Sequence, residues 1–381
     1  MNGQTNIDPV LAGRIGEAIL TLGYRRNLAA ASIRPGWTSR VLGLIISDLA
    51  NPYYSVLTRS SETYAREKGY LLISASSDED GERHDDLVDR LLEQRVDGIF
   101  IVPPRKEGRS WQSVPQPIPP LVFLDRPVDF AQADVILADN AGGARTATAA
   151  LLDAGASRIA FVGDDLSIYT MQERFEGYSA ALRERGIPVD DRLVFTDAHS
   201  SEQASGIMRK LLQQTDAGAV FAANNLASLG ALLAFREAGR RLPLIGFDDF
   251  EAAQVTEPAV SVVSQDIIEM GRRAAELLIG RLNGETPSPD TRTLPTTLVL
   301  REPNVSNPDG FRLRAGAQRR RTEDHLREQL HLNRRSGLAG CRSQCRARQV
   351  IDRLTHRGDP HRFGNEGVVK ARHRHVPTLQ R

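Results

Sequence analysis

The chain has 381 residues, 40% of them hydrophobic and 25% charged, a composition typical of a globular protein with two or three domains. No apolar run reaches the roughly 18 residues of a membrane span, and the N-terminus lacks the apolar core of a signal peptide, so we expect a cytoplasmic protein without membrane contact. The formal net charge of +1 conceals an asymmetry: residues after 311 carry +12, which leaves −11 for residues 1–311.

The first 24 residues predict one amphipathic helix. Asp8 can cap its start, Pro9 suits the first helical position, apolar residues recur at helical spacing, and Gly23 can end it. A basic, Ala-rich segment follows at 25–39. Its helical stretch is shorter than the ~12–15 residues that an isolated helix needs in water, so we expect it to fold only with a partner.

From residue 41 apolar strands alternate with helical segments. Residues 41–46 form a continuous apolar run, which is typical of a parallel strand buried on both faces. The predicted strands of the first set are 41–46, 70–75, 98–102, 121–124 and 135–138, with helices near 53–68 and 82–95. The second set comprises strands 158–162, 193–196, 219–223 and 242–247 with helices 141–154, 171–185, 201–214 and 226–238. Segment 260–263, helix 267–282 and strand 297–300 close the domain. The two sets of alternating strands and helices predict an α/β fold of two similar lobes with parallel sheets.

Polar residues follow the strand ends. In open α/β sheets ligands bind beyond the carboxyl ends of the strands, so Asp48, Tyr53 and Tyr54, which follow strand 41–46, should face a ligand crevice. A capped helix with two half-exposed tyrosines is the structural alternative.

Catalytic groups are scarce before the tail. Residues 1–303 contain two histidines, His84 and His199, and no cysteine. They also contain no nucleophile elbow, P-loop or zinc-protease motif. Carboxylates at strand ends, Asp48 with Asp125 and the pair Asp248-Asp249, could act as a glycosidase acid and base or hold sugar hydroxyls without catalysis. We favour the second interpretation and expect no catalytic residues and no enzyme.

The tail at 304–381 is rich in Arg and His and has no sustained apolar periodicity. It could bind nucleic acid through its charge, or it could be a disordered extension, which we favour because the composition changes just after a strand that completes the fold. Cys341 and Cys345 have no second pair to form a zinc site. We therefore expect no metal and no cofactor.

Linked motifs from Met1 to about Pro303 resemble the LacI/GalR (lactose-repressor type) family of bacterial transcription regulators. The motifs are Leu22-Gly-Tyr-Arg25 with Asn27, Gly43-Leu-Ile-Ile, Asn51-Pro-Tyr-Tyr54, Val96-Asp-Gly-Ile99, Leu124-Asp-Arg126, Arg174-Phe-Glu-Gly-Tyr178, Ala222-Ala-Asn-Asn225, Gly246-Phe-Asp-Asp249 and Gly271-Arg-Arg-Ala-Ala275. The resemblance implies a periplasmic-binding-protein-like core of two flavodoxin-like lobes, joined by a hinge helix to an N-terminal helix-turn-helix.

The implied domains are a helix-turn-helix remnant at 1–24, a hinge at 25–39 and an effector-binding domain at 40–303. Lobe one would comprise about 40–138 and 264–290, and lobe two about 139–263 and 291–303. The family's functions imply a ligand-responsive regulator, in keeping with a repressor, that binds a sugar-like effector and operator DNA as a homodimer. We expect helix 267–282, with Ile268, Ala275, Leu278 and Ile279, to contribute to pairing.

Site residues are carried over from the family's motifs. The effector cleft would be lined by Tyr53, Tyr54, Asp125, Thr170, Arg174, Phe221, Asn224 and Asp248. The DNA-binding hinge would use Tyr24, Arg25, Asn27, Ile33 and Arg34, with Ile33 as an apolar wedge in the minor groove.

The sequence departs from the family in three places. Met1 aligns just after the recognition helix, which enters the major groove; Ala31 replaces a usual arginine; and the turn at 240–246 is shortened. Two hypotheses follow: a repressor whose gene start lies upstream of Met1, or a stand-alone small-molecule-binding protein without specific DNA binding. Retention of the basic hinge favours the first.

Overall fold

The computed structural model describes residues 8–23, 38–105, 109–114, 117–130, 133–285 and 287–301. Helix α1 (Pro9–Thr21) begins as predicted, because the carboxylate of Asp8 accepts hydrogen bonds from the backbone N of Val10 at 2.7 Å and of Leu11 at 3.3 Å. No residue of α1 is buried. The predicted hinge contacts Tyr24, Arg25, Asn27, Ile33 and Arg34, and the tail at 304–381, lie outside the described residues.

The first lobe is built on a six-stranded parallel sheet with the strand order β11-β5-β4-β3-β1-β2. Its strands are β1 (Val41–Ile46), β2 (Leu71–Ser76), β3 (Gly98–Ile101), β4 (Leu121–Leu124), β5 (Asp134–Ala138) and β11 (Thr291–Leu294). Its helices are α3 (Pro52–Glu67), α4 (Gly81–Glu93), the short η1 (Trp111–Ser113) and α10 (Ile267–Leu282). Leu42 and Leu44–Ile46 are fully buried, as the apolar run predicted.

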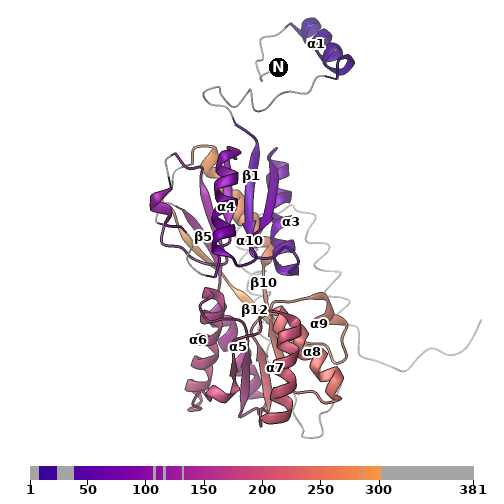
Figure 1. Cartoon of the computed structure of the whole chain (residues 1–381), viewed down its shortest axis with the longest axis vertical. Helices are drawn as coiled ribbons and strands as arrows, with labels where there is room; N and C mark the ends of the chain where they lie inside the picture. The colour runs from indigo at the N-terminus through magenta and orange to yellow at the C-terminus, as the bar shows by residue number, and fades with distance from the viewer. Residues whose placement is uncertain are drawn as a thin grey trace, which may run out of the picture. The chain divides into compact units, whose positions relative to one another are not determined.

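The second lobe repeats this arrangement with the order β12-β10-β9-β8-β6-β7. Its strands are β6 (Ile159–Val162), β7 (Val194–Phe195), β8 (Ala219–Ala222), β9 (Leu244–Phe247), β10 (Ser261–Gln265) and β12 (Thr296–Val299). Its helices are α5 (Asn140–Asp153), α6 (Tyr169–Glu184), η2 (Asp191–Leu193), α7 (Ser201–Gln214), α8 (Asn225–Ala238) and α9 (Glu251–Val255). Only the outermost strand, β12, runs antiparallel to its neighbour β10. The predicted two-lobe α/β fold is confirmed (Figure 1).

Within the described ranges, three segments cross between the lobes. They are the junction of β5 and α5, the junction of β10 and α10, and Pro295 between β11 and β12. The predicted lobe boundary is wrong for residues 291–294, which were assigned to lobe two but pair with β5 in the first sheet. This strand lies at the sheet edge and is largely exposed, so its sequence carries no apolar run to mark it.

Helix α10 packs within its own lobe. Ala275 and Leu278 are fully buried and Ile279 is 4% exposed, all in the core of the first lobe, whereas only Ile268 of the predicted pairing residues is exposed. The prediction that this apolar face forms a dimer contact is therefore wrong for Ala275, Leu278 and Ile279, because the helix uses them to cover the sheet. Among the described residues, no helix combines the length and apolar character needed to cross a membrane.

Candidate functional site

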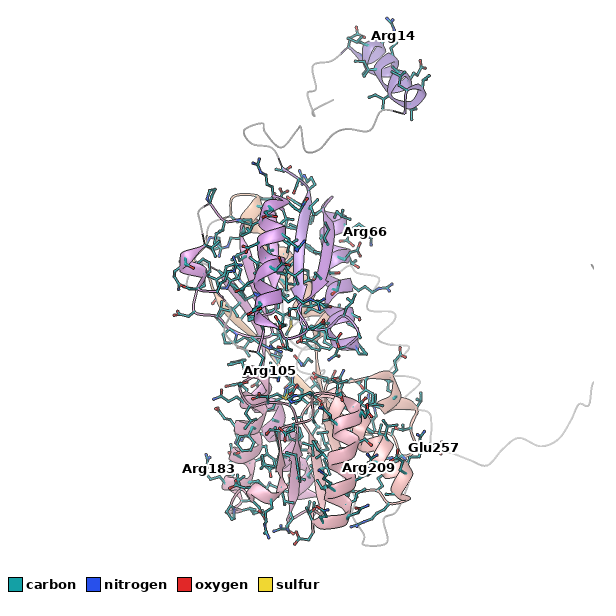
Figure 2. The ribbon with its side chains drawn as sticks, viewed as in Figure 1. Arg14, Arg66, Arg105, Arg183, Arg209 and Glu257 are labelled. Atoms are coloured by element: carbon teal, nitrogen blue, oxygen red, sulfur yellow. The ribbon has the colours of Figure 1, made fainter. Side chains whose placement is uncertain are left out.

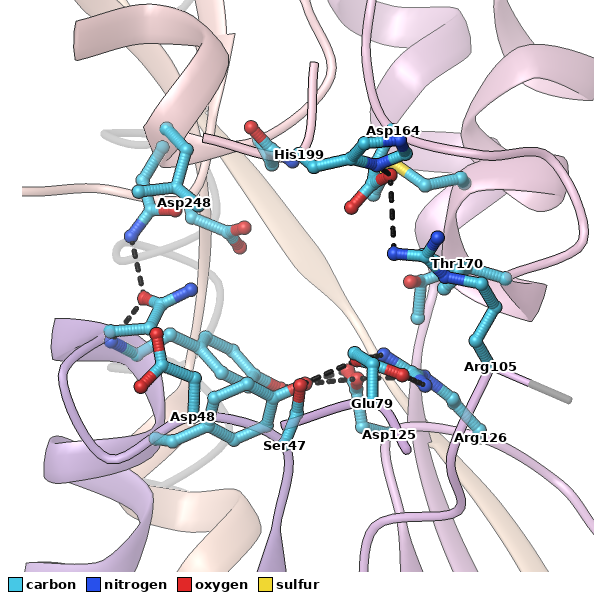
Figure 3. Close-up of a pocket in the computed structure, with 18 of the residues that line it drawn as sticks. Ser47, Asp48, Glu79, Arg105, Asp125, Arg126, Asp164, Thr170, His199 and Asp248 are labelled. Carbon is cyan, nitrogen blue, oxygen red and sulfur yellow. Dashed lines mark hydrogen bonds and ion pairs between the residues drawn. The ribbon is translucent and has the colours of Figure 1, made fainter. Parts of the chain in front are cut away.

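A cavity of about 430 Å³ lies where the carboxyl ends of the two sets of strands face each other (Figure 3). The first lobe lines it with Ser47, Asp48, Asn51, Tyr53, Tyr54, Asp78, Glu79, Arg105, Asp125 and Arg126. The second lobe lines it with Asp164, Ile168, Thr170, Met171, Arg174, His199, Asn224, Asn225, Leu226 and Asp248.

The structure brings most of the predicted effector residues into this cavity. Those that line it are Tyr53, Tyr54, Asp125, Thr170, Arg174, Asn224 and Asp248. Phe221 is the exception. Its fully buried ring packs in the core of the second lobe, 5.9 Å from the ring of Phe161. A side chain in the middle of a strand points to a face of the sheet rather than to its end, so the prediction placed Phe221 in the cleft wrongly.

Asp125 is fixed by two tyrosines of α3. The hydroxyl of Tyr53 donates to Asp125 Oδ1 at 3.0 Å, and that of Tyr54 donates to Oδ2 at 3.4 Å. The two rings meet edge to face, with centroids 5.0 Å apart. Burial and the neighbouring carboxylate of Asp125 raise the pKa of both tyrosines well above the ordinary value, so both hydroxyls stay protonated and donate. The Asp125 carboxylate is thereby presented as an oriented acceptor.

Arg126 and Glu79 form a second fixed pair. Arg126 donates from Nη1 to Glu79 Oε2 at 2.7 Å and from Nη2 to Oε1 at 2.6 Å, a bidentate contact, and Nη1 also reaches the carbonyl of Pro103 at 2.8 Å. Burial by itself raises the pKa of Glu79, but the hydrogen bonds and charge of Arg126 outweigh it and lower the pKa overall. Glu79 is therefore ionised at neutral pH.

In the second lobe Arg174 lies at the centre of a buried network. Its Nη1 donates to the carbonyl of Ala223 at 2.7 Å and to Asp248 Oδ2 at 3.2 Å, and its guanidinium carbon lies 3.8 Å from the centroid of the Phe247 ring. Gln265 donates from Nε2 to the other oxygen of Asp248 at 2.5 Å. Burial raises the pKa of Asp248, and the charge of Arg174 opposes this only in part.

Few polar contacts join the lobes across the cavity. Arg105 of the first lobe lies 3.6 Å from Asp164 and 3.8 Å from Asp165 of the second, ion-pair distances too long for hydrogen bonds, and it lies at the junction of the lobes in Figure 2. Asn225, at the start of α8, donates to Asn51 Oδ1 at 2.8 Å. Opening the cleft would break these contacts at modest cost.

Sequence reasoning missed Glu79, Arg105, Asp164 and His199 as lining residues. Each follows a strand by no more than four residues, after β2, β3, β6 and β7 respectively. The rule that placed Asp48 beyond the end of β1 would have found all of them had it been applied to every parallel strand.

The lining residues include six carboxylates, at Asp48, Asp78, Glu79, Asp125, Asp164 and Asp248, against three arginines, at 105, 126 and 174. This balance disfavours an anionic ligand, while the fixed carboxylates and guanidinium suit hydroxyl groups. Over the described ranges, no cluster of three or more His, Cys, Asp or Glu is placed to hold a metal ion.

Comparison with known proteins agrees with the architecture. A periplasmic binding protein-like domain matches residues 148–302. The HTH-type transcriptional regulator CelR of Thermobifida fusca is 32% identical over 314 residues, which cover 79% of this chain and 92% of that protein. The ribose operon repressor of Haemophilus influenzae is 28% identical over 309 residues, with the same shares of 79% and 92%.

A solved structure shows the same fold with a sugar present. It is that of a LacI family transcriptional regulator from Enterococcus faecium with bound ribose, which superposes with a TM-score of 0.62 at 25% identity and covers 68% of this chain and 97% of that one. The regulator CelR is 32% identical and is matched over 92% of its length, the fold has two repeated lobes, and the linked motifs occur in order. The chain therefore belongs to the LacI/GalR family of transcriptional regulators.

Proposed function

We propose that this regulator binds a neutral sugar, or a similarly sized polyhydroxylated metabolite, in the cavity between its lobes and thereby controls binding to operator DNA. One observation carries the proposal. Asp125 of the first lobe and the Arg174–Asp248 pair of the second line a single cavity of about 430 Å³, and each is held in place by buried partners.

The chemistry of these groups fits hydroxyls. A carboxylate accepts, and a guanidinium donates, two hydrogen bonds in a fixed fork, so each can hold a vicinal diol. Part of the Arg174 guanidinium remains free to donate to a ligand, because its Nε and Nη1 donate to protein acceptors while its Nη2 has no acceptor among the described residues. Bond cleavage is not required, and we propose that the protein is not an enzyme.

Ligand binding would favour the closed arrangement of the lobes. Only a few polar contacts, such as those of Arg105 and Asn225, join the lobes across the cavity. A ligand that contacts Asp125 on one side and Arg174 on the other adds bonds that exist only when the lobes are close. A ligand shifts such an equilibrium by its difference in affinity for the two states. The three crossing segments are the places where the backbone would bend.

The DNA contacts remain a proposal from the family motifs. Tyr24, Arg25, Asn27, Ile33 and Arg34 lie in the segment that would contact the operator, with arginines at the phosphates and Ile33 in the minor groove. Fluorescence anisotropy on palindromic and random duplexes over a salt series tests this. Binding that depends only on salt and not on sequence would favour a stand-alone effector-binding protein.

We also propose a homodimer that pairs through the first lobe. Its surface exposes large apolar side chains on α3, β2 and α10 and on the turn that precedes α3, namely Leu49, Val56, Leu71, Ile73 and Ile268. In the described part of the second lobe, Val255 is the large apolar side chain that is comparably exposed. Isologous pairing through one such surface is the commonest form of assembly.

Thermal unfolding with a panel of neutral monosaccharides, sugar phosphates and nucleosides tests the effector class. A neutral sugar should raise the unfolding temperature, because a ligand that binds the folded chain stabilises it by mass action. Stabilisation by phosphorylated or nucleoside ligands alone would contradict the proposal.

A further inference from the structure

A second cavity, of about 530 Å³, adjoins the first. The two cavities share two side chains of their lining, Arg105 and Arg126. Among the described residues, the partners of Arg105 are Asp164 and Asp165, at ion-pair distances of 3.6 Å and 3.8 Å, and its buried Nε has no hydrogen-bond partner there. The wall between the cavities is thus a long side chain without a fixed hydrogen bond, which a ligand can displace or contact from both sides.

The lining of this side cavity combines aromatic and proline side chains with polar ones. Trp111 of η1 stands edge to face on Phe123, with centroids 5.4 Å apart. Pro127 and Val128 also line this cavity, and Tyr169 of the second lobe lines it while packing against the core of the first lobe. Aromatic and proline surfaces of this kind cover the apolar faces of ring-shaped ligands.

Besides the Nε of Arg105, three buried polar atoms in the lining have no hydrogen-bond partner among the described residues, and they belong to His84, Arg109 and Arg126. His84 is 2% exposed; its Nδ1 lies 3.2 Å from Asp85, and its Nε2 has no hydrogen-bond partner. The Nε of Arg126 is likewise buried and without a hydrogen bond. A buried polar atom left unpaired is costly, so these atoms mark positions where a ligand hydroxyl would gain a bond.

The arginines of the side cavity do not make it an anion site. Arg109 pairs with Asp89 at 2.7 Å, Arg126 pairs with Glu79 at 2.6 Å, and Arg105 lies beside Asp164. Each positive charge is already matched by a carboxylate. The cavity therefore suits a neutral group that hydrogen-bonds to guanidinium edges, not a phosphate or a carboxylate.

We infer that the effector is a neutral disaccharide or glycoside whose second ring occupies this side cavity, with the glycosidic linkage passing between Arg105 and Arg126. The inference rests on the proposed function, because it assumes that the first ring lies in the cavity lined by Asp125 and Arg174. It adds that the ligand is larger than one ring and that Trp111 and Tyr169 select the second ring.

Calorimetry on the full chain tests this with neutral hexoses and pentoses and with the α- and β-linked disaccharides built from each. A disaccharide should bind at least about tenfold more tightly than its constituent monosaccharide, a difference of ~1.4 kcal/mol. Two variants separate the cavities, since neither Ser167 nor Tyr169 lines the first one. Ser167→Trp, at an exposed position, should fill the side cavity, and Tyr169→Ala should remove part of its wall.

Both variants should lose most of the advantage of the disaccharide while binding the monosaccharide as the wild type does. Tyr64→Ala, a half-buried tyrosine on α3 that lines neither cavity, is the matched control and should keep that advantage. Disaccharides that bind no better than monosaccharides, equal losses for both ligands in the variants, or a preference for anionic glycosides would overturn the inference. If no neutral sugar of either size binds the wild type, the proposed function itself fails.

Discussion

The Nε of Arg174 donates a 2.8 Å hydrogen bond to Oδ1 of Asn140, the residue with which α5 begins after the first crossing between the lobes. The partner of Arg174 in the cavity, Asp248, is bonded in the same way to Gln265, the last residue of β10 before the second crossing. The third crossing is tied to the first, since the backbone N of Asp139 donates to the carbonyl of Leu294 at 2.9 Å. The proposed ligand-binding residues of the second lobe, Arg174 and Asp248, are therefore bonded directly to the segments about which the lobes would move.

Asn140→Ala should weaken effector binding and the coupling of binding to closure. The variant removes the acceptor of Arg174 Nε, a charge-assisted bond of ~1.5–3 kcal/mol, so affinity should fall by about tenfold or more. Titration calorimetry measures the affinity, and small-angle scattering with and without ligand measures closure. Unchanged affinity together with unchanged closure would show that the Asn140 contact has no functional role.

Glu79→Gln should destabilise the first lobe in a pH-dependent way. Because the pKa of Glu79 is lower in the folded chain than its ordinary value of 4.5, its ionised form contributes stability above that pH, and the contribution is lost as the pH falls through the folded pKa. At neutral pH the loss should be ~1–3 kcal/mol, since Arg126 keeps a buried charge with a weakened partner. Urea unfolding of both proteins between pH 7 and pH 4 should show the difference narrowing toward acid.

An exposed pair gives the control for that experiment. Glu62 and Arg66 lie 3.2 Å apart on the surface of α3. Glu62→Gln should change the free energy of unfolding by less than ~1 kcal/mol at every pH. Equal effects of the two substitutions would mean that burial of the Glu79–Arg126 pair adds nothing to stability.

Gly177→Ala should destabilise the second lobe, because α5 and α6 pack closely at this position. A Cβ added there would lie 2.1 Å from the carbonyl oxygen of Ala141 and 2.9 Å from Cβ of Ala144. The clash is with backbone, so the helices must separate at a cost of at least ~1–3 kcal/mol. Gly206→Ala on α7 is the matched control: its nearest neighbour is Nη2 of Arg209 at 3.8 Å, and the change should stabilise by ~0.4–1 kcal/mol. Thermal unfolding measures both effects. A shift of the unfolding temperature in the same direction for both variants would be inconsistent with close packing of α5 and α6 at Gly177.

Leu71→Glu should dissociate the proposed homodimer. Leu71 is 61% exposed on the edge strand β2, and a carboxylate there would have to be desolvated on pairing. Val255→Glu, at a position of the second lobe that is 80% exposed, should leave the dimer intact. Light scattering at micromolar concentration distinguishes them. A wild-type monomer would refute the dimer, and a dimeric Leu71→Glu variant would place its interface elsewhere.

The buried strands could be predicted from sequence because both of their faces are covered, which gives continuous apolar runs such as Val41–Ile46. Strand β11 could not, because its Thr-Arg-Thr-Leu segment lies at an exposed edge and is defined by pairing with β5 rather than by burial. Among site residues, those directly after strands, such as Asp125 and Asp248, were accessible to sequence reasoning. Phe221 was misplaced because the face of the sheet toward which a mid-strand side chain points depends on register.

The contacts among the site residues could not be predicted from the sequence. Asp125 and Asp248 follow equivalent strands of the two lobes, and both adopt left-handed backbone, with φ of 68° and 69°. Non-glycine residues adopt this conformation rarely, and it is consistent with a position that the surrounding structure fixes. Only the folded arrangement shows that one carboxylate is held by tyrosines and the other by Arg174 and Gln265.

The position of the effector between the lobes is tested most directly by calorimetry on Arg174→Ala. The substitution removes the guanidinium that would donate to the ligand and leaves Asp248 without its cationic partner. Arg185→Ala, just beyond the end of the same helix, is the control, because Arg185 pairs at the surface with Asp153 and lines neither cavity. Circular dichroism checks that both variants are folded at the temperature of the titration.

The ligand for this titration is the neutral sugar that most raises the unfolding temperature of the wild type. Arg174→Ala should bind it at least about tenfold more weakly, since each charge-assisted hydrogen bond contributes ~1.5–3 kcal/mol, while Arg185→Ala should bind it as the wild type does. A folded Arg174→Ala variant with wild-type affinity would contradict the assignment of the cavity between the lobes as the effector site.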